Sequence, residues 1–358
     1  MKKSQMLKLI LGLTPATVVI ILVLIIFIYM RRRAKKNFND IESTEHKHGD
    51  EIASEELMAF QGGQDLTISD ILEAPGEVIG KSNYGTLYKA LLQRSNCVRL
   101  LRFLRPICTA RGEDFLDVIH LLGGVRHPNL VPLLGFYAGP RGEKLLVHPF
   151  YRHGNLAQFI SDGSPESHKW TVILEISTGI ARGLDHLHSG LQKPIIHGNL
   201  KSKNILLDRN HKPFISDFSL FLLLNPTAGQ EMLEASAAEG YKAPDLIKMR
   251  DANEETDIYS FGIILLELLS GKEAISENPS NDEDFYLPTF MRNAVLDRRI
   301  SDLYHPDILL SNGSDIRRPV TEECILKFFQ LAMACCAPSP SIRPNMKEVL
   351  CKLEEIER

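Results

Sequence analysis

The chain has 358 residues, of which 44% are hydrophobic and 24% charged, and its formal net charge is −4. This length allows one two-lobed domain of about 250–300 residues with further segments, and the charge gives no reason to expect nucleic acid as a partner. The six cysteines form no C-x-x-C pair with histidine partners, which argues against a zinc site and is typical of free thiols in a reducing compartment.

The first predicted element is a membrane-spanning helix over residues 9–30, a stretch of 22 residues without a charge. As a helix it would extend roughly 33 Å, enough to cross a bilayer. A cleaved signal peptide is the alternative, but the apolar run is too long and no A-x-A-like site follows it. Five cations after the span outweigh three before it. We therefore expect residues 1–8 outside the cytosol and the rest of the chain inside it.

Three further segments follow the predicted span. Residues 31–65 are basic and then polar and acidic, which predicts a cytosolic juxtamembrane linker. From residue 66 to about 151 the pattern favours short strands, with one helical patch around residues 113–122. From about 152 to 358 helical periodicity dominates. A small β-rich part before a larger helical part predicts a two-lobed α+β fold.

Several motifs then occur in one order. A glycine-rich hairpin is indicated by "IGKSNYGTLYKA" at 79–90, a catalytic loop by "IIHGNLKSKNILLD" at 195–208, and the ends of an activation segment by "ISDFSL" at 215–220 and "GYKAPD" at 240–245. Together with "RPNM" at 343–346, they resemble a plant receptor-like protein kinase of the leucine-rich-repeat type, over about 290 residues. The resemblance implies a bilobal protein-kinase fold, without the extracellular repeats, and Asp245 pairing with Arg343.

The residues that would hold the nucleotide depart from the family's pattern. Gly80, Gly85 and Leu87 fall in the ATP site that the resemblance implies, but Ser82 replaces the middle glycine of the loop. We expect a hairpin there and leave nucleotide contact open.

Charged positions on the next strand and helix also differ. Aligned without gaps, "CVRLLRFL" at 97–104 places Leu101 where the family has its phosphate-binding lysine and Arg99 where it has a small residue above adenine. Strand alternation then puts both on the cleft face. Val118 falls at the position of the lysine's glutamate partner, so we expect an apolar contact with Leu101 to replace the ion pair. A one-residue bulge would instead bring Arg102 into the cleft, an alternative we disfavour because no insertion is needed elsewhere.

The catalytic loop keeps some groups and loses others. Asn199 stands at the position of the general base and cannot take a proton near neutral pH. Lys201 is retained, either to neutralise a phosphate or as an ordinary surface lysine. Asn204 and Asp217 match the family's Mg²⁺ ligands.

These changes favour a membrane-anchored receptor-like pseudokinase that signals by binding active receptor-like kinases or other signalling proteins. The alternatives are an atypical, weakly active Ser/Thr kinase in which Arg99 or Arg102 replaces the lysine, and a switch that binds nucleotide without transferring phosphate. The sequence leaves enzymatic activity open. The resemblance implies ATP and Mg²⁺ as cofactors, but the lost groups count against both. The expected location of the chain is the plasma membrane.

Overall fold

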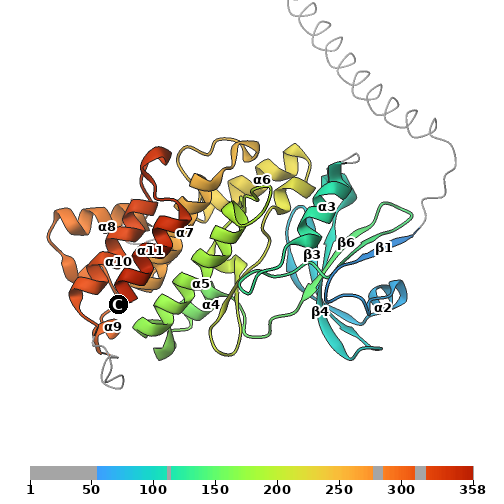
Figure 1. The fold of residues 1–358 in the computed structure, drawn as a ribbon, viewed down its shortest axis with the longest axis horizontal. Helices are drawn as coiled ribbons and strands as arrows, with labels where there is room; N and C mark the ends of the chain where they lie inside the picture. The colour runs from blue at the N-terminus through green and yellow to red at the C-terminus, as the bar shows by residue number, and fades with distance from the viewer. Residues whose placement is uncertain (1–54, 111–113, 277–284, 311–319, 358) are drawn as a thin grey trace, which may run out of the picture. The chain divides into compact units, whose positions relative to one another are not determined.

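The computed structural model describes residues 55–110, 114–276, 285–310 and 320–357 (Figure 1). The predicted membrane span at 9–30 lies outside these residues. Within the part of the chain that the structure describes, none of the helices combines the length and apolarity needed to cross a bilayer.

The first lobe is built on a six-stranded antiparallel sheet in the order β1-β5-β6-β4-β3-β2. Its strands are β1 (Glu56–Ala59), β2 (Gly76–Lys81), β3 (Gly85–Leu92), β4 (Cys97–Leu104), β5 (Gly135–Ala138) and β6 (Lys144–Pro149). The predicted linker therefore ends too late. Residues 56–59, which we assigned to it, form the strand at one edge of this sheet. Their short, polar-flanked pattern gave no strand signal of its own.

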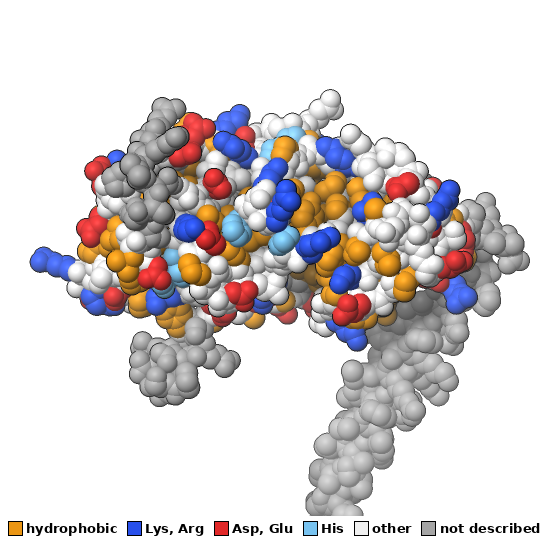
Figure 2. Space-filling view, turned by 90° about the horizontal axis from the view of Figure 1, so that it is seen from below, with side chains coloured by type: hydrophobic (Ala, Val, Ile, Leu, Met, Phe, Trp, Pro, Cys, Tyr) orange, Lys and Arg blue, Asp and Glu red, His pale blue; other side chains and the backbone are white. Residues whose placement is uncertain are grey.

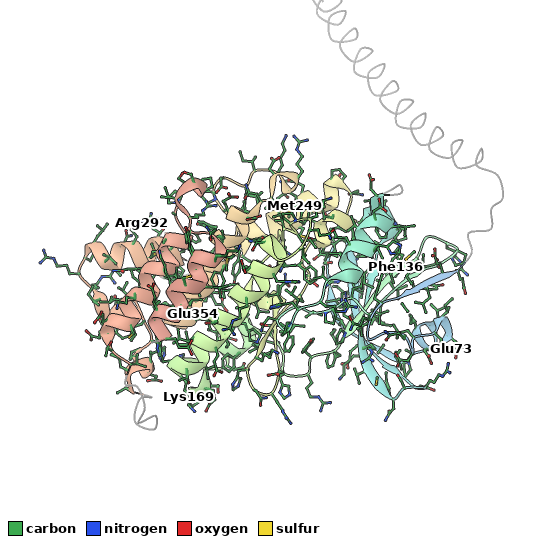
Figure 3. The ribbon with its side chains drawn as sticks, in the orientation of Figure 1. Glu73, Phe136, Lys169, Met249, Arg292 and Glu354 are labelled. Atoms are coloured by element: carbon green, nitrogen blue, oxygen red, sulfur yellow. The ribbon has the colours of Figure 1, made fainter. Side chains whose placement is uncertain are left out.

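Two helices accompany the sheet, α2 (Ile68–Leu72) and α3 (Asp114–Gly124). Helix α3, expected from the helical patch, buries its apolar side against the lobe (Figure 1). The ring of Phe115 on α3 lies 5.7 Å from that of Phe136 on β5, the residue labelled in Figure 3. The ammonium of Lys144 on β6 lies 3.6 Å from the Phe115 ring centroid. The aromatic pair and the cation fix the helix beside the strands that carry the site.

The second lobe is mostly helical, as predicted. Its helices are α4 (Leu156–Ser161), α5 (Trp170–Ser189), α6 (Pro226–Ala238), α7 (Glu254–Ser270), α8 (Leu287–Leu296), α9 (Asp307–Leu310), α10 (Glu322–Cys335) and α11 (Met346–Glu357). Two short pairs of strands complete it, β7 (Ile205–Leu207) with β8 (Pro213–Ile215), and β9 (Ile275–Ser276) with β10 (Phe285–Tyr286). Helix α7 is mostly apolar and is buried over nearly its whole length, so it forms the centre of this lobe. The two-lobed α+β prediction is confirmed.

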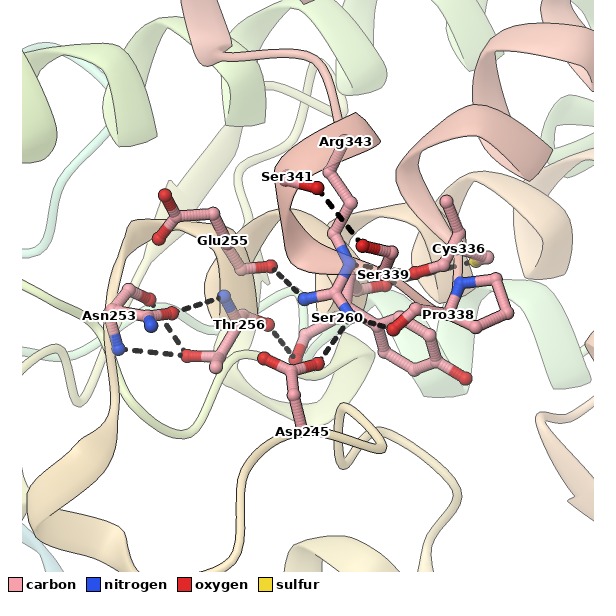
Figure 4. Close-up of polar contacts among 12 residues, drawn as sticks. Asp245, Asn253, Glu255, Thr256, Ser260, Cys336, Pro338, Ser339, Ser341 and Arg343 are labelled. Atoms are coloured by element: carbon pink, nitrogen blue, oxygen red, sulfur yellow. Dashed lines mark hydrogen bonds and ion pairs between the residues drawn. The ribbon is translucent and has the colours of Figure 1, made fainter.

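A buried ion pair joins the end of the activation segment to the final part of the chain. The Arg343 guanidinium binds the Asp245 carboxylate, donates 2.8 Å hydrogen bonds to the carbonyls of Ala337 and Glu255, and lies over the Tyr259 ring (Figure 4). The Arg343 side chain has no exposed surface. The predicted pairing of Asp245 with Arg343 is confirmed, and the shorter aspartate arm is long enough.

Candidate functional site

Strand β4 determines which side chains face the cleft between the lobes. Its pairing with β3 runs without a shift from Leu92 opposite Cys97 to Gly85 opposite Leu104. Because side chains alternate along a strand, residues 100, 102 and 104 share the face toward the second lobe. Leu104 accordingly belongs to the large core, whereas Leu101 is buried in a separate cluster on the other face of the sheet with Ala90, Leu92 and Val147.

This register shows that our prediction of which β4 residues face the cleft is wrong. Leu101 and Arg99 lie on the opposite face, and the disfavoured alternative, Arg102 in the cleft, is the arrangement observed. No bulge within β4 is needed. The turn between β3 and β4, at residues 93–96, ends on Asn96 with φ 50°. It is one residue longer than our ungapped alignment assumed. The expected contact between Leu101 and Val118 is also wrong, because the two residues pack in different clusters.

Arg102 is bound to Asp217. Its Nη2 donates to both carboxylate oxygens, at 2.5 and 2.6 Å, and the two side chains are only 6% and 16% exposed. A buried pair of this kind is strongly coupled, because either group left alone would be an uncompensated charge. Helix α3 offers Arg102 no other acid in this position. Val118 packs against the core, while Asp114 and Asp117 are both exposed.

The catalytic loop is anchored from helix α7. The Asp257 carboxylate accepts backbone hydrogen bonds from His197 at 2.7 Å and Gly198 at 2.9 Å, and a side-chain bond from His188 at 2.9 Å. Gly198 has φ 73°, which glycine adopts without strain. A Cβ there would also lie 2.6 Å from atoms of Phe221 and Met249. Glycine is therefore the residue that fits this loop where the family has arginine.

Asn199 faces the cavity without a partner for its amide oxygen. The residue is 5% exposed, its backbone N–H donates to His197 Nδ1 at 3.2 Å, and its Oδ1 accepts no hydrogen bond among the described residues. Its backbone carbonyl accepts a 2.8 Å bond from the Asn204 amide. Asn204 therefore has a structural role in holding the loop, whatever else it binds.

Lys201 is not a free cation. It pairs at 2.7 Å with Glu239, just after helix α6, and Lys203 pairs with the other oxygen of the same carboxylate at 2.9 Å. Burial raises the pKa of Glu239, but the hydrogen bonds and charges of the two lysines outweigh this effect and hold the pKa below its usual range. Lys201, the cation that the resemblance retains, is thus already paired with a carboxylate of the chain, which it shares with Lys203.

The segment after β8 explains why serine replaces the last glycine of the D-F-G motif. Asp217 and Ser219 have φ values of 63° and 56°. The Ser219 hydroxyl donates to the Ile196 carbonyl at 2.6 Å, and its backbone N–H donates to the His197 carbonyl at 3.0 Å. These bonds fix Asp217 beside the catalytic loop and offset the strain of the left-handed conformation.

The glycine-rich hairpin closes in a similar way. The Ser82 hydroxyl accepts from the Gly85 N–H at 3.1 Å and lies 3.2 Å from the Gly85 carbonyl, so the serine stabilises the turn that it occupies. Tyr84, at the tip, lies half-buried near the ion pair. Burial raises the pKa of the Tyr84 hydroxyl, and the charges of Arg102 and Asp217 act on it in opposite directions.

A cavity of about 470 Å³ lies under this hairpin. Seven of the nine predicted site residues line it: Gly80, Gly85, Leu87, Asn199, Lys201, Asn204 and Asp217. Arg99 and Leu101 do not. Its other side chains include Arg102 and Tyr84, together with Glu231, Met232, Ala235 and Glu239 from helix α6 and its end.

Helix α6 is the part of the site that sequence reasoning missed. The activation segment is helical over 226–238, and the signal was present in the sequence as Asn-Pro at 225–226. The Asn225 side chain accepts from the Ala228 N–H at 2.9 Å and caps the helix, and Pro226 occupies its first position.

A second, small cavity lies behind Arg102 and includes His148, Leu122 and Phe218. The Nδ1 of His148 lies 3.0 Å from the Pro132 carbonyl, which can only accept, so this nitrogen carries the proton. Burial lowers the pKa of His148 to about 4, so the ring is neutral at pH 7. His148 thus adds no positive charge beside Arg102.

The residues present do not fit a divalent metal in this arrangement. Mg²⁺ needs oxygen ligands that are free to bind it, and both oxygens of Asp217 accept hydrogen bonds from a guanidinium. Asn204, the other ligand that the resemblance implies, donates through Nδ2 to the Asn199 carbonyl, which does not occupy its Oδ1, so the misfit rests on Asp217.

Comparison with known proteins gives consistent matches. The family model described as protein tyrosine and serine/threonine kinase matches residues 74–353. The kinase-like protein TMKL1 of Arabidopsis thaliana is 37% identical over 354 residues, which cover 97% of this chain and 52% of that protein. Other Arabidopsis relatives are named as leucine-rich repeat receptor-like kinases or as inactive receptor kinases. The chain spans about half, or less, of the length of these relatives.

Two solved structures are similar. The maize SIRK1 kinase domain bound to AMP-PNP is 29% identical with a TM-score of 0.73, and the match covers 85% of this chain and all of that one. The pseudokinase domain of BIR2, an immune regulator of the RLK/Pelle family, is 30% identical with a TM-score of 0.62, covering 78% of this chain and 80% of that one.

Proposed function

We propose that this chain, which belongs to the protein tyrosine and serine/threonine kinase family and is related to plant receptor-like kinases, is a receptor-like pseudokinase that signals by binding other proteins. The observation that carries the proposal is the side chain at the base position. Asn199 lies in the cavity with an amide where proton transfer needs a carboxylate.

The neighbouring cations support the same conclusion. Lys201 is bound to Glu239, which it shares with Lys203, and Arg102 is bound to Asp217, so each would have to leave its partner to balance the charge that moves in phosphoryl transfer. Relatives named as inactive receptor kinases, and the similarity to a pseudokinase domain, make such a protein plausible within this family.

The proposal includes a membrane anchor and protein partners. Residues 9–30 would hold the chain in the plasma membrane by a single helix, with the kinase-like domain in the cytosol beside receptor-like kinases or other signalling proteins. Proximity labelling by the full-length chain, compared with a variant lacking residues 9–30, would identify these partners.

Phosphotransfer by the purified full-length chain tests the proposal directly. With ATP and either Mg²⁺ or Mn²⁺, we expect no turnover above that of the Asp217→Ala variant. Turnover at an ordinary kinase rate of about 1–100 s⁻¹ that Asp217→Ala abolishes would overturn it.

A nucleotide-binding switch is the second candidate, and the 470 Å³ cavity beside Gly80 and Gly85 favours it. Arg102, and not Arg99, is the cation in position to meet phosphate, so an atypical kinase would also depend on Arg102. A thermal shift induced by millimolar ATP, and lost in Arg102→Gln but kept in Arg99→Gln, would support nucleotide binding. No shift would support a role through protein binding alone.

A further inference from the structure

The backbone of Arg102 is fixed beside Asp217. It pairs with Leu87 of β3 on one side and with Leu146 of β6 on the other, so the strand is held in the interior of the sheet. Only the side chain could move.

Among the acids around the pair, Glu231 on α6 lines the same cavity and is exposed. The acidic residues of helix α3, Asp114 and Asp117, are exposed, and Val118 is apolar. Glu239, across the cavity, is held by two lysines. A divalent ion approaching Asp217 would therefore have to displace a guanidinium that is bound to both oxygens of this carboxylate.

We propose that Arg102 is a built-in cation that takes the place of the divalent metal at Asp217 and closes this carboxylate to metal ions. The inference rests on the proposed function, since it explains how the site holds its shape without a cofactor. One positive charge bound to both carboxylate oxygens supplies the neutralisation that a metal would otherwise supply. Tyr84, packed near the pair, covers it from the hairpin side.

Terbium luminescence tests this directly, because Tb³⁺ seeks the oxygen ligands that Mg²⁺ seeks, and Tyr84 lies near enough to Asp217 to sensitise it. The full-length chain in detergent, without nucleotide, is titrated with Tb³⁺ and excited at the tyrosine band. The wild type and Asp217→Asn should give the same signal. Arg102→Gln should gain luminescence that excess Mn²⁺ removes and that the double variant Arg102→Gln/Asp217→Asn lacks.

A matched control comes from the exposed arginine at the end of the same strand. Arg105→Gln removes an equal charge nearby and should gain nothing, which separates release of Asp217 from a general change in charge. Wild-type luminescence that Asp217→Asn abolishes would overturn the proposal. So would a correctly folded Arg102→Gln protein, judged by circular dichroism, that gains no signal.

The comparison of the wild type with Asp217→Asn still tests whether metal binds Asp217 if Arg102→Gln fails to fold. The result is also separable from that of the proposed function. Metal bound to Asp217 without turnover would end this inference and leave the pseudokinase standing, whereas turnover in the phosphotransfer assay would end the pseudokinase.

Discussion

At the scale of single residues, Arg102 and Asp217 are each tolerable only because the other is present. Both are largely removed from water, and their bond crosses between the lobes, from β4 to the segment after β8. Breaking a buried pair by removing one partner leaves a charge without compensation, whereas removing both leaves none.

We therefore expect strong coupling between the two substitutions. Arg102→Met and Asp217→Asn should each lower the free energy of unfolding by about 3–5 kcal/mol, and the double variant should lose clearly less than the sum. Urea unfolding of the full-length chain in detergent, followed by the fluorescence of its single tryptophan, Trp170, measures this. Additive losses would show that the pair contributes no coupling.

A second residue-scale prediction concerns the buried Glu267 on α7. Burial raises its pKa to about 7, while hydrogen bonds from Tyr241, at 2.7 and 2.8 Å, and from the Ala274 N–H act in the opposite direction. The folded state then keeps a proton that the unfolded chain releases near pH 4.5. Stability should fall as pH rises from about 4.5 to about 7 and change no further above that, with a total on the order of 3 kcal/mol.

Unfolding measured across this pH range, with Glu267→Gln beside the wild type, isolates the effect. The variant should show a flatter dependence, whereas Glu175→Gln, an exposed change on α5, should follow the wild type. Parallel curves for Glu267→Gln and the wild type would contradict the assignment.

At the scale of elements, the sequence predicted the two lobes, the hairpin, helix α3 and the Asp245–Arg343 pair, because each depends on local pattern or on motif order. It failed at β4. Strand alternation predicts which residues share a face but not which face is inward, and one residue in the turn at 93–96 exchanges the two. The ion pair between Glu239 and Lys201 could not be predicted from the sequence either. It joins the catalytic loop to the end of helix α6, and these lie close together only because of the way the activation segment folds.

Helix α6 depends on its capping residue. Asn225 accepts from the Ala228 N–H, and its amide donates to the Ile107 carbonyl at 2.7 Å, which ties the helix start to the first lobe. Asn225→Ala should cost about 1 kcal/mol or more and speed hydrogen exchange at the start of the helix. Thr227→Ala, an exposed neighbour, is the control. Unchanged exchange in Asn225→Ala would show that the cap does not hold α6.

At the scale of the whole molecule, one face of the described surface is mixed in charge. On the face drawn in Figure 2, acidic and basic side chains are interspersed, with apolar side chains exposed among them. Such a face offers no single-sign field to draw the domain to anionic lipid. Membrane attachment is therefore expected to depend on residues 9–30 and the cations that follow them.

Deletion of residues 9–30 tests this dependence. The full-length chain should sediment with membranes and resist extraction at alkaline pH, while the deleted form should move to the soluble fraction. In a companion variant, glutamine replaces the five cations at 31–36. This change should weaken the preference for placing the kinase-like domain in the cytosol, without releasing the chain from the membrane. A deleted form that stays in the membrane would place the anchor elsewhere.

The bond between Arg102 and Asp217 also bears on what catalysis by this site would require under the proposed function. Restoring a carboxylate through Asn199→Asp would supply a base, yet Asp217 would still be occupied. A lysine in place of Arg102 would not leave Asp217 either, because position 118 on helix α3 is a valine and supplies no carboxylate to bind the lysine. Under the proposed function, catalysis would need a carboxylate at position 199, an acid at position 118 and a cation at position 102 that releases Asp217, and none of these changes alone supplies the other two.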